Sequence, residues 1–115
     1  MKIGVTSQNY RTITGHAGKT RRFLIYTPDE NGKPVESDRL NLPKEMSMHE
    51  FRGINHPLEE LDILITGSCG EGFVRRMSTH GVRVIATAET DPLVAASLVL
   101  SGKPLPAAAP HEHSH

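Results

Sequence analysis

The sequence predicts a single α/β domain in which a mixed β-sheet is flanked by helices. Three observations support this prediction. The chain has 115 residues, which is room for one hydrophobic core. Its first 41 residues contain three segments of strand composition, and the order after residue 61 is strand, helix, strand, helix. Strands joined by a helix pair in parallel and strands joined by a tight turn pair antiparallel, so both kinds of pairing are expected.

The first part of the chain is expected to supply three strands. Residues 2–7 alternate in polarity as a half-buried strand does, and residues 21–27 are rich in strand formers. A polar loop, residues 8–20, joins them. Residues 28–33 contain Asn-Gly and have turn composition, so residues 35–41 should pair back as a hairpin strand whose polarity indicates a sheet edge.

The link from residue 42 to residue 61 is the least regular part of the sequence. Residues 44–52 are expected to form one or two helical turns, and residues 57–61 a short helix that opens on a proline. The link also holds His49 and His56. Both are secondary ligand candidates, since an intervening glycine and proline argue against one helix running through both.

The second half has clearer signals. Residues 62–66 form a short apolar run typical of a buried strand, and a glycine-rich turn, residues 67–72, leads into a helix over residues 71–80. Residues 82–86 are another buried strand. An Asp-Pro pair then opens an apolar helix that extends to residue 100.

The last eleven residues are expected to form a disordered, histidine-rich tail, which leaves residues 1–104 as the folded domain. The segment 105–115 is rich in Pro and Ala and ends in His-Glu-His-Ser-His. His111, His113 and His115 alternate along it. Such a tract could chelate nickel, copper or zinc without a preformed site.

The composition argues against several classes of protein. The formal net charge is zero and aromatic residues are few, which argues against nucleic-acid binding. No apolar stretch approaches the ~20 residues of a membrane span, and the start turns polar before an export signal could form. We therefore expect a soluble, cytoplasmic protein. Cys69 is the only cysteine, so its thiol is either packing or a ligand in a reducing compartment.

The first candidate ligand is His16, which lies between small residues in the loop 8–20, with Lys19 and Arg21 close by. Imidazole binds iron, copper and zinc, and cationic neighbours suit an anionic cluster. The alternative is an exposed or hydrogen-bonded loop histidine with no ligand.

The second candidate is Cys69, which follows a buried strand and, with Ser68 and Gly70, precedes a helix. Ligands gather at the carboxyl ends of strands in open α/β sheets. The helix dipole and free amides could favour the thiolate, although a small buried hydrophobic residue is an equal alternative. If Cys69 and His16 converge, they form a mixed sulfur–nitrogen site. The amides of residues 67–72 could instead hold a phosphate or another small anion.

The sequence argues against a nuclease or another hydrolase. A nuclease built on such a sheet needs clustered acidic residues to hold metal ions. The first strand has no carboxylate, and Asp62 starts its strand rather than ending it. No spacing singles out a nucleophile with its base. We therefore do not expect an enzyme.

Three stretches of the sequence resemble the dinitrogenase iron–molybdenum cofactor biosynthesis family, the NifX- and NafY-like proteins. They are Met1-Lys2-Ile3-Gly4-Val5-Thr6-Ser7; Gly15-His16-Ala17-Gly18 followed by Phe23-Leu24-Ile25-Tyr26; and Asp62-Ile63-Leu64-Ile65-Thr66-Gly67 leading through Gly70 to His80-Gly81-Val82-Arg83-Val84. Their order and spacing over residues 1–102 carry the resemblance. Family members often have Phe where this chain has Ala17.

The resemblance implies a ribonuclease-H-like fold and a non-enzymatic protein that binds or carries an iron–sulfur or iron–molybdenum cluster, or its precursor. On this basis we expect His16 and Cys69 to contact the metal, and Lys19, Arg21, Ser68 and Gly70 to line the site. The implied partners are metallocluster donor and acceptor proteins, such as those of nitrogenase assembly, and a second copy of the chain could complete the site as a homodimer. The alternative function is a small-anion or regulatory-ligand binding module that uses the 67–72 turn without metal.

Overall fold

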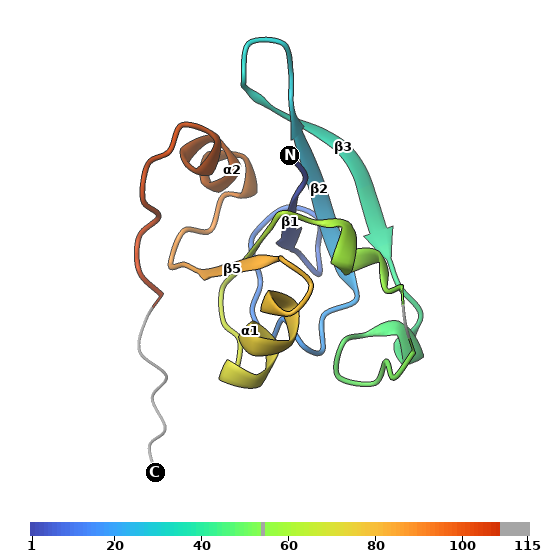
Figure 1. Ribbon diagram of the computed structural model, residues 1–115. Helices are drawn as coiled ribbons and strands as arrows, with labels where there is room; N and C mark the ends of the chain where they lie inside the picture. Colours follow the sequence, from blue (N-terminus) through green and yellow to red (C-terminus); the bar gives the residue numbers. More distant parts are fainter. Residues whose placement is uncertain (54, 109–115) are drawn as a thin grey trace.

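The computed structural model describes residues 1–53 and 55–108 and contains one five-stranded sheet (Figure 1). The strand order is β3-β2-β1-β4-β5, in which β1 pairs in parallel with β4 and β4 with β5, while β2 pairs antiparallel with both β1 and β3. The strands are β1 (Ile3–Thr6), β2 (Arg22–Pro28), β3 (Pro34–Asn41), β4 (Ile63–Thr66) and β5 (Arg83–Ala86). The predicted mixed sheet, with its hairpin strand at one edge, is confirmed.

The two helices pack against opposite faces of the sheet, as Figure 1 shows for α1 and α2. Helix α2 (Pro92–Leu100) contributes Ala95 and Ala96 to one core cluster, and helix α1 (Glu71–Ser78) contributes Met77 to the other. Alternate residues of β4 enter the two clusters, which is why its sequence reads as a continuous apolar run. No helix among the described residues is long and apolar enough to cross a bilayer.

The link between β3 and β4 is less helical than predicted. It contains only two short 3₁₀ turns, η1 (Lys44–Met46) and η2 (Pro57–Glu60), so the prediction of helical turns through residue 52 is wrong beyond residue 46. The reason lies in α1, where the guanidinium of Arg76 donates to the carbonyls of Met48 and Phe51, at 2.6 and 2.8 Å. A helix that continued to residue 52 would have used the Met48 carbonyl itself, although it would have left the Phe51 carbonyl free at its end.

His56 is a structural residue of this link and not a ligand candidate. Its ring is buried, and Nδ1 accepts a hydrogen bond from the Leu58 amide at 3.0 Å, which caps η2. The other ring nitrogen faces the Met46 carbonyl. Both contacts are satisfied together by the neutral tautomer with its proton on Nε2.

The ordered chain extends beyond the predicted domain boundary at residue 104. Leu105 packs on the core cluster of α2, and the Pro106 carbonyl accepts hydrogen bonds from the Thr87 hydroxyl and the Ala88 amide. Ala107 then forms an isolated antiparallel bridge with Thr87. The predicted start of the tail is therefore too early by at least three residues. The three tail histidines lie outside the described residues.

Candidate functional site

Three buried threonines mark the carboxyl edge of the parallel strands. Thr6 and Thr66 end β1 and β4, Thr87 follows β5, and all three side chains are at most 2% exposed. The Thr6 hydroxyl lies 2.9 Å from the Thr66 hydroxyl and also contacts the carbonyl of Thr14 in the loop above. Each hydroxyl has one proton to donate: the Thr6 hydroxyl can donate to the Thr14 carbonyl, and the Thr66 hydroxyl to the Ser68 carbonyl at 3.1 Å. Neutral hydroxyls, rather than carboxylates, thus hold the loop to the sheet.

The loop that carries His16 is fastened to the turn after β4. The His16 amide donates to the Ser68 hydroxyl at 2.9 Å, and the Ala17 amide donates to the Ser68 carbonyl at 3.1 Å. Gly15 is required for this approach, because a Cβ there would lie 2.4 Å from the Ser68 oxygen. His16 itself has φ of 56°, in the left-handed region that a non-glycine residue adopts at a cost. These hydrogen bonds therefore join two segments that lie 52 residues apart in the sequence.

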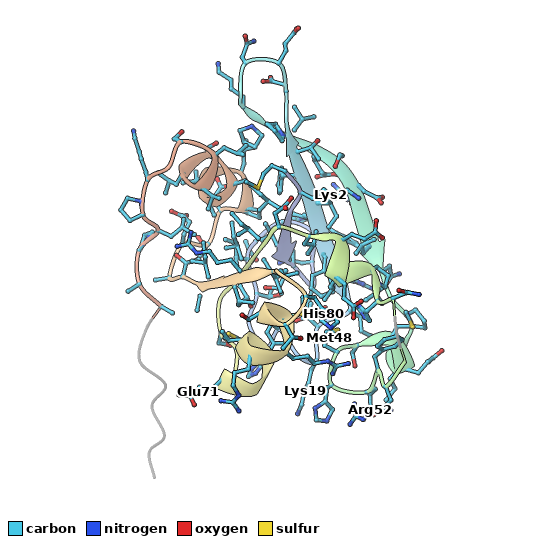
Figure 2. The ribbon with its side chains drawn as sticks, in the orientation of Figure 1. Lys2, Lys19, Met48, Arg52, Glu71 and His80 are labelled. Atoms are coloured by element: carbon cyan, nitrogen blue, oxygen red, sulfur yellow. The ribbon has the colours of Figure 1, made fainter. Side chains whose placement is uncertain are left out.

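This fastening places His16 and Cys69 in the wall of one pocket. The pocket has a volume of about 660 Å³ and is lined by His16, Ala17, Gly18, Lys19, His49, Ser68, Cys69, Gly70, Glu71 and Phe73. Figure 2 shows two of its residues, Lys19 from the loop and Glu71 from the start of α1. Five of the residues proposed from sequence therefore meet at one place. Arg21 instead lines a neighbouring hollow, with Lys19, Lys44, Ser47, His49 and Glu50.

Burial acts on the electrostatics of Cys69. Its side chain is partly buried, and this desolvation raises the pKa of the thiol above its ordinary value. This direction is opposite to the stabilised thiolate that the helix dipole could favour, and it agrees with the alternative of a buried cysteine. A metal that bound here would have to displace the thiol proton, so binding would strengthen as pH rises.

His49, Glu71 and Phe73 are pocket residues that the sequence did not single out as part of this site. The loop and the β3–β4 link meet where the His49 amide donates to the Gly18 carbonyl at 2.6 Å. His49 consequently lines this pocket and two adjoining hollows. The sequence indicates His49 as a possible ligand. Its position beside the loop, however, depends on Arg76, which holds the β3–β4 link against α1.

The donor set is small and the pocket is open. Among residues 1–53 and 55–108, no three His, Cys, Asp or Glu side chains form a group that could hold a metal ion. One imidazole and one thiol fit a group that brings its own bridging ligands, as a metal–sulfur cluster brings sulfide. They fit a bare ion less well, because structural metal sites usually have four protein ligands. Few ligands also allow exchange, and Lys19 supplies positive charge for an anionic group.

The comparisons with known proteins show the family and the fold of the chain. A family model described as dinitrogenase iron-molybdenum cofactor matches residues 1–101. The crystal structure of PH0822 is similar over 90% of this chain and 93% of that one, with a TM-score of 0.68 and 14% identity. A candidate dinitrogenase from Methanocaldococcus jannaschii is similar over 90% of both chains, with a TM-score of 0.65 and 17% identity. These likenesses confirm the predicted α/β fold, a mixed sheet flanked by helices. No curated protein matches the sequence at a significant level.

Proposed function

Because the chain belongs to the dinitrogenase iron-molybdenum cofactor family, we propose that it is a non-enzymatic carrier of an iron–sulfur or iron–molybdenum cluster or its precursor. The cargo would be taken up in the pocket between the His16 loop and the 67–70 turn, and released to an acceptor during cofactor biosynthesis or trafficking. Iron, as part of the cargo, would be bound by the Cys69 sulfur and an imidazole nitrogen of His16. A reducing cytoplasm suits an unprotected thiol in this role.

The observation that carries the proposal is the pair of hydrogen bonds from the His16 and Ala17 amides to Ser68. They connect the loop that carries His16, a borderline ligand, with the turn that carries Cys69, a soft ligand. The two side chains, from opposite halves of the chain, therefore line one open pocket. The same bonds fix the backbone at His16, whose φ is 56°. The Lys19 ammonium at the rim would offset part of the charge of the cluster.

The partners in this proposal are a cluster donor and a cluster acceptor, with nitrogenase assembly proteins as the leading class. Two protein ligands leave most cluster atoms facing outward, where an acceptor can attack them. A second copy of the chain could also cover that face and complete the ligand set as a homodimer. Light scattering of the cluster-free and the reconstituted protein would separate these two arrangements.

The test is anaerobic reconstitution with iron, sulfide and molybdate, followed by metal analysis and visible spectroscopy. We expect a stoichiometric chromophore in the wild type that is lost in Cys69→Ala and at least weakened in His16→Ala. The matched control is His80→Ala, since His80 lies 3.3 Å from Glu59 and is not a pocket residue. A chromophore that survives both pocket substitutions, or none under any condition, would overturn the proposal.

A small-anion binding module is the second candidate, and one observation favours it. Helix α1 begins at Glu71 with no side chain capping its first amides, beside a pocket that contains Lys19. In that case inorganic phosphate should bind equally well to the wild type and to Cys69→Ala, and more weakly to Lys19→Ala. Cluster binding makes the opposite prediction for Cys69→Ala.

A further inference from the structure

The hollow beside the pocket is enclosed by the loop before β2 and the β3–β4 link. Two backbone hydrogen bonds join these segments. The Leu42 amide donates to the Arg21 carbonyl at 2.9 Å, and the His49 amide donates to the Gly18 carbonyl at 2.6 Å. The hollow has a volume of about 440 Å³, within the range of small-molecule sites of roughly 300–1,000 Å³. Its walls are therefore fixed at both ends, and they are formed by Lys19, Arg21, Lys44, Ser47, His49 and Glu50.

Positive charge dominates this hollow. Its walls contain the cations Lys19, Arg21 and Lys44 but only a single acid, Glu50. None of these cations forms an ion pair with an acid among residues 1–53 and 55–108. Figure 2 shows Lys19 at the end of the molecule that also carries Arg52, a further cation of the link. Because the cations repel one another with no acid at ion-pair distance, a multiply charged anion between them would be stabilised.

The hollow also contains a buried hydroxyl group without a partner in the described chain. Ser47 is only 4% exposed, and its side chain forms no hydrogen bond to residues 1–53 or 55–108. Since no fully enclosed side-chain atom there lacks a partner, the accessible part of Ser47 includes its Oγ, and this part lines the hollow. The Ser47 carbonyl accepts from the amides of Glu50 and Phe51, at 3.0 and 2.8 Å, which fixes the backbone. The hydroxyl is thus placed to donate to an anion in the hollow.

We propose that this hollow binds a phosphate-class anion, either a single phosphate or a diphosphate, at a site separate from the His16–Cys69 pocket. The guanidinium of Arg21 can donate to two anion oxygens at once, the ammonium groups of Lys19 and Lys44 balance the charge, and the Ser47 hydroxyl donates to a further oxygen. This site uses no metal and no thiol. It also differs from an anion site at the 67–72 turn, because Arg21, Lys44 and Ser47 do not line the pocket at that turn.

The experiment is a titration of the metal-free full chain with inorganic phosphate and with pyrophosphate at low ionic strength, followed by calorimetry and amide NMR spectra. We expect one saturable site per chain, with the largest shifts at residues 19–21 and 44–49. Lys44→Ala and Arg21→Ala should each weaken binding about tenfold or more. The matched control is Lys33→Ala, which removes a positive charge from the turn between β2 and β3 and should bind as the wild type does. Tighter binding of pyrophosphate would identify a diphosphate, and equal affinities a single phosphate.

Ser47→Ala separates a built site from a general attraction to a basic surface, because it leaves the charge unchanged. It should weaken binding roughly 2–10-fold. No saturable binding, an unchanged affinity in Ser47→Ala, or the same loss in Lys33→Ala as in Lys44→Ala would overturn the inference. A loss in Lys19→Ala with none in Arg21→Ala or Lys44→Ala would also overturn it, since the anion would then lie at the 67–72 turn.

Thermal melts of each variant establish that the domain is folded. The titration contains no metal, so its failure would leave the cluster reconstitution described above unaffected. Likewise, a failed reconstitution would leave this site standing.

Discussion

The two ends of the sheet are held by different kinds of interaction. At the carboxyl end, buried threonine hydroxyls and backbone groups fasten the His16 loop to the 67–70 turn, with Thr6, Thr66 and Thr87 at most 2% exposed. At the amino end, the Asp62 carboxylate accepts from the Lys2 amide at 2.7 Å and lies 3.9 Å from the terminal amine. There the partners are half-exposed, and a further ion pair joins Lys2 to Glu60 at 3.8 Å.

The difference shows where the fold keeps its geometry fixed. Exposed ion pairs contribute about 0–1 kcal/mol and weaken in salt, so the amino end can adjust. A buried hydroxyl that loses its partner costs about 1–3 kcal/mol, so the carboxyl end is held in one arrangement. The pocket lies at the end that is less able to adjust, as the proposed two-ligand site would require.

The strongest test of this contrast is Thr66→Val, which keeps the shape of the side chain and removes its hydroxyl. The Thr6 hydroxyl and the Ser68 carbonyl each keep another partner but lose one hydrogen bond. At about 0.5–1.5 kcal/mol for each bond, the free energy of unfolding should fall by about 1–3 kcal/mol. Urea denaturation measures the loss. The control is Thr79→Val, since the Thr79 hydroxyl bonds Arg76 at an exposed position. Equal losses in the two variants would refute the contrast.

A second substitution, Gly15→Ala, acts on the fastening directly. The new methyl would lie 2.4 Å from the Ser68 oxygen, so that side chain must move and release the His16 amide. We expect a loss of about 1–2 kcal/mol in stability and a large chemical-shift change at the His16 amide in NMR spectra. Gly18→Ala is the matched variant in the same loop, because its methyl would meet Phe73 at an ordinary 3.9 Å. A His16 amide that does not shift in Gly15→Ala would contradict this account.

The stability contributed by the β3–β4 link should respond to pH through His56. Burial lowers the pKa of this imidazole in the folded state, and its Nδ1 must stay unprotonated to accept from Leu58. The unfolded chain therefore binds the proton first, and stability should fall as pH drops through the unfolded value of about 6.5. Urea denaturation at pH 7.5 and pH 5.5 measures this fall. His56→Asn, which can still cap η2, should show a smaller fall; an identical pH dependence would assign the effect to other groups.

The smallest effect is expected at the amino end. Asp62→Asn removes the charge from an exposed network and leaves an oxygen that can accept from the Lys2 amide. The change in unfolding free energy should be below about 1 kcal/mol. It should shrink further in about 0.5 M salt, which screens exposed ion pairs. A larger, salt-independent loss would show that the amino end is as constrained as the pocket.

Local signals were sufficient to predict most of the fold. The apolar run of β4, the glycine-rich turn before α1 and the Asp-Pro cap of α2 each act within a few residues, and α2 spans residues 92–100 as predicted. The Asp91 carboxylate caps it by accepting from the Leu93 amide at 2.9 Å. The link after β3 was predicted less well, because Arg76 takes carbonyls that lie 25 and 28 residues away in sequence.

The site was predictable in outline only. The rule that ligands gather at the carboxyl ends of strands indicated Cys69, whereas the convergence of His16 on the same place stayed conditional in the sequence. The part played by His49 was not predictable, because its approach to Gly18 depends on the packing of the irregular link. The sequence left two states open for Cys69, a favoured thiolate and a buried cysteine, because the burial that raises the pKa of its thiol depends on packing at the pocket wall.

The left-handed backbone at His16 means that stability and ligand binding favour different residues at this position. Glycine adopts a φ of 56° without steric cost, and asparagine does so more readily than most residues, so either could raise the melting temperature. Neither would supply an imidazole. A library at position 16 that was selected for thermostability alone should therefore discard histidine, whereas selection for cargo retention should recover it. The cost of the local conformation thus becomes an observable trade-off between two selection regimes.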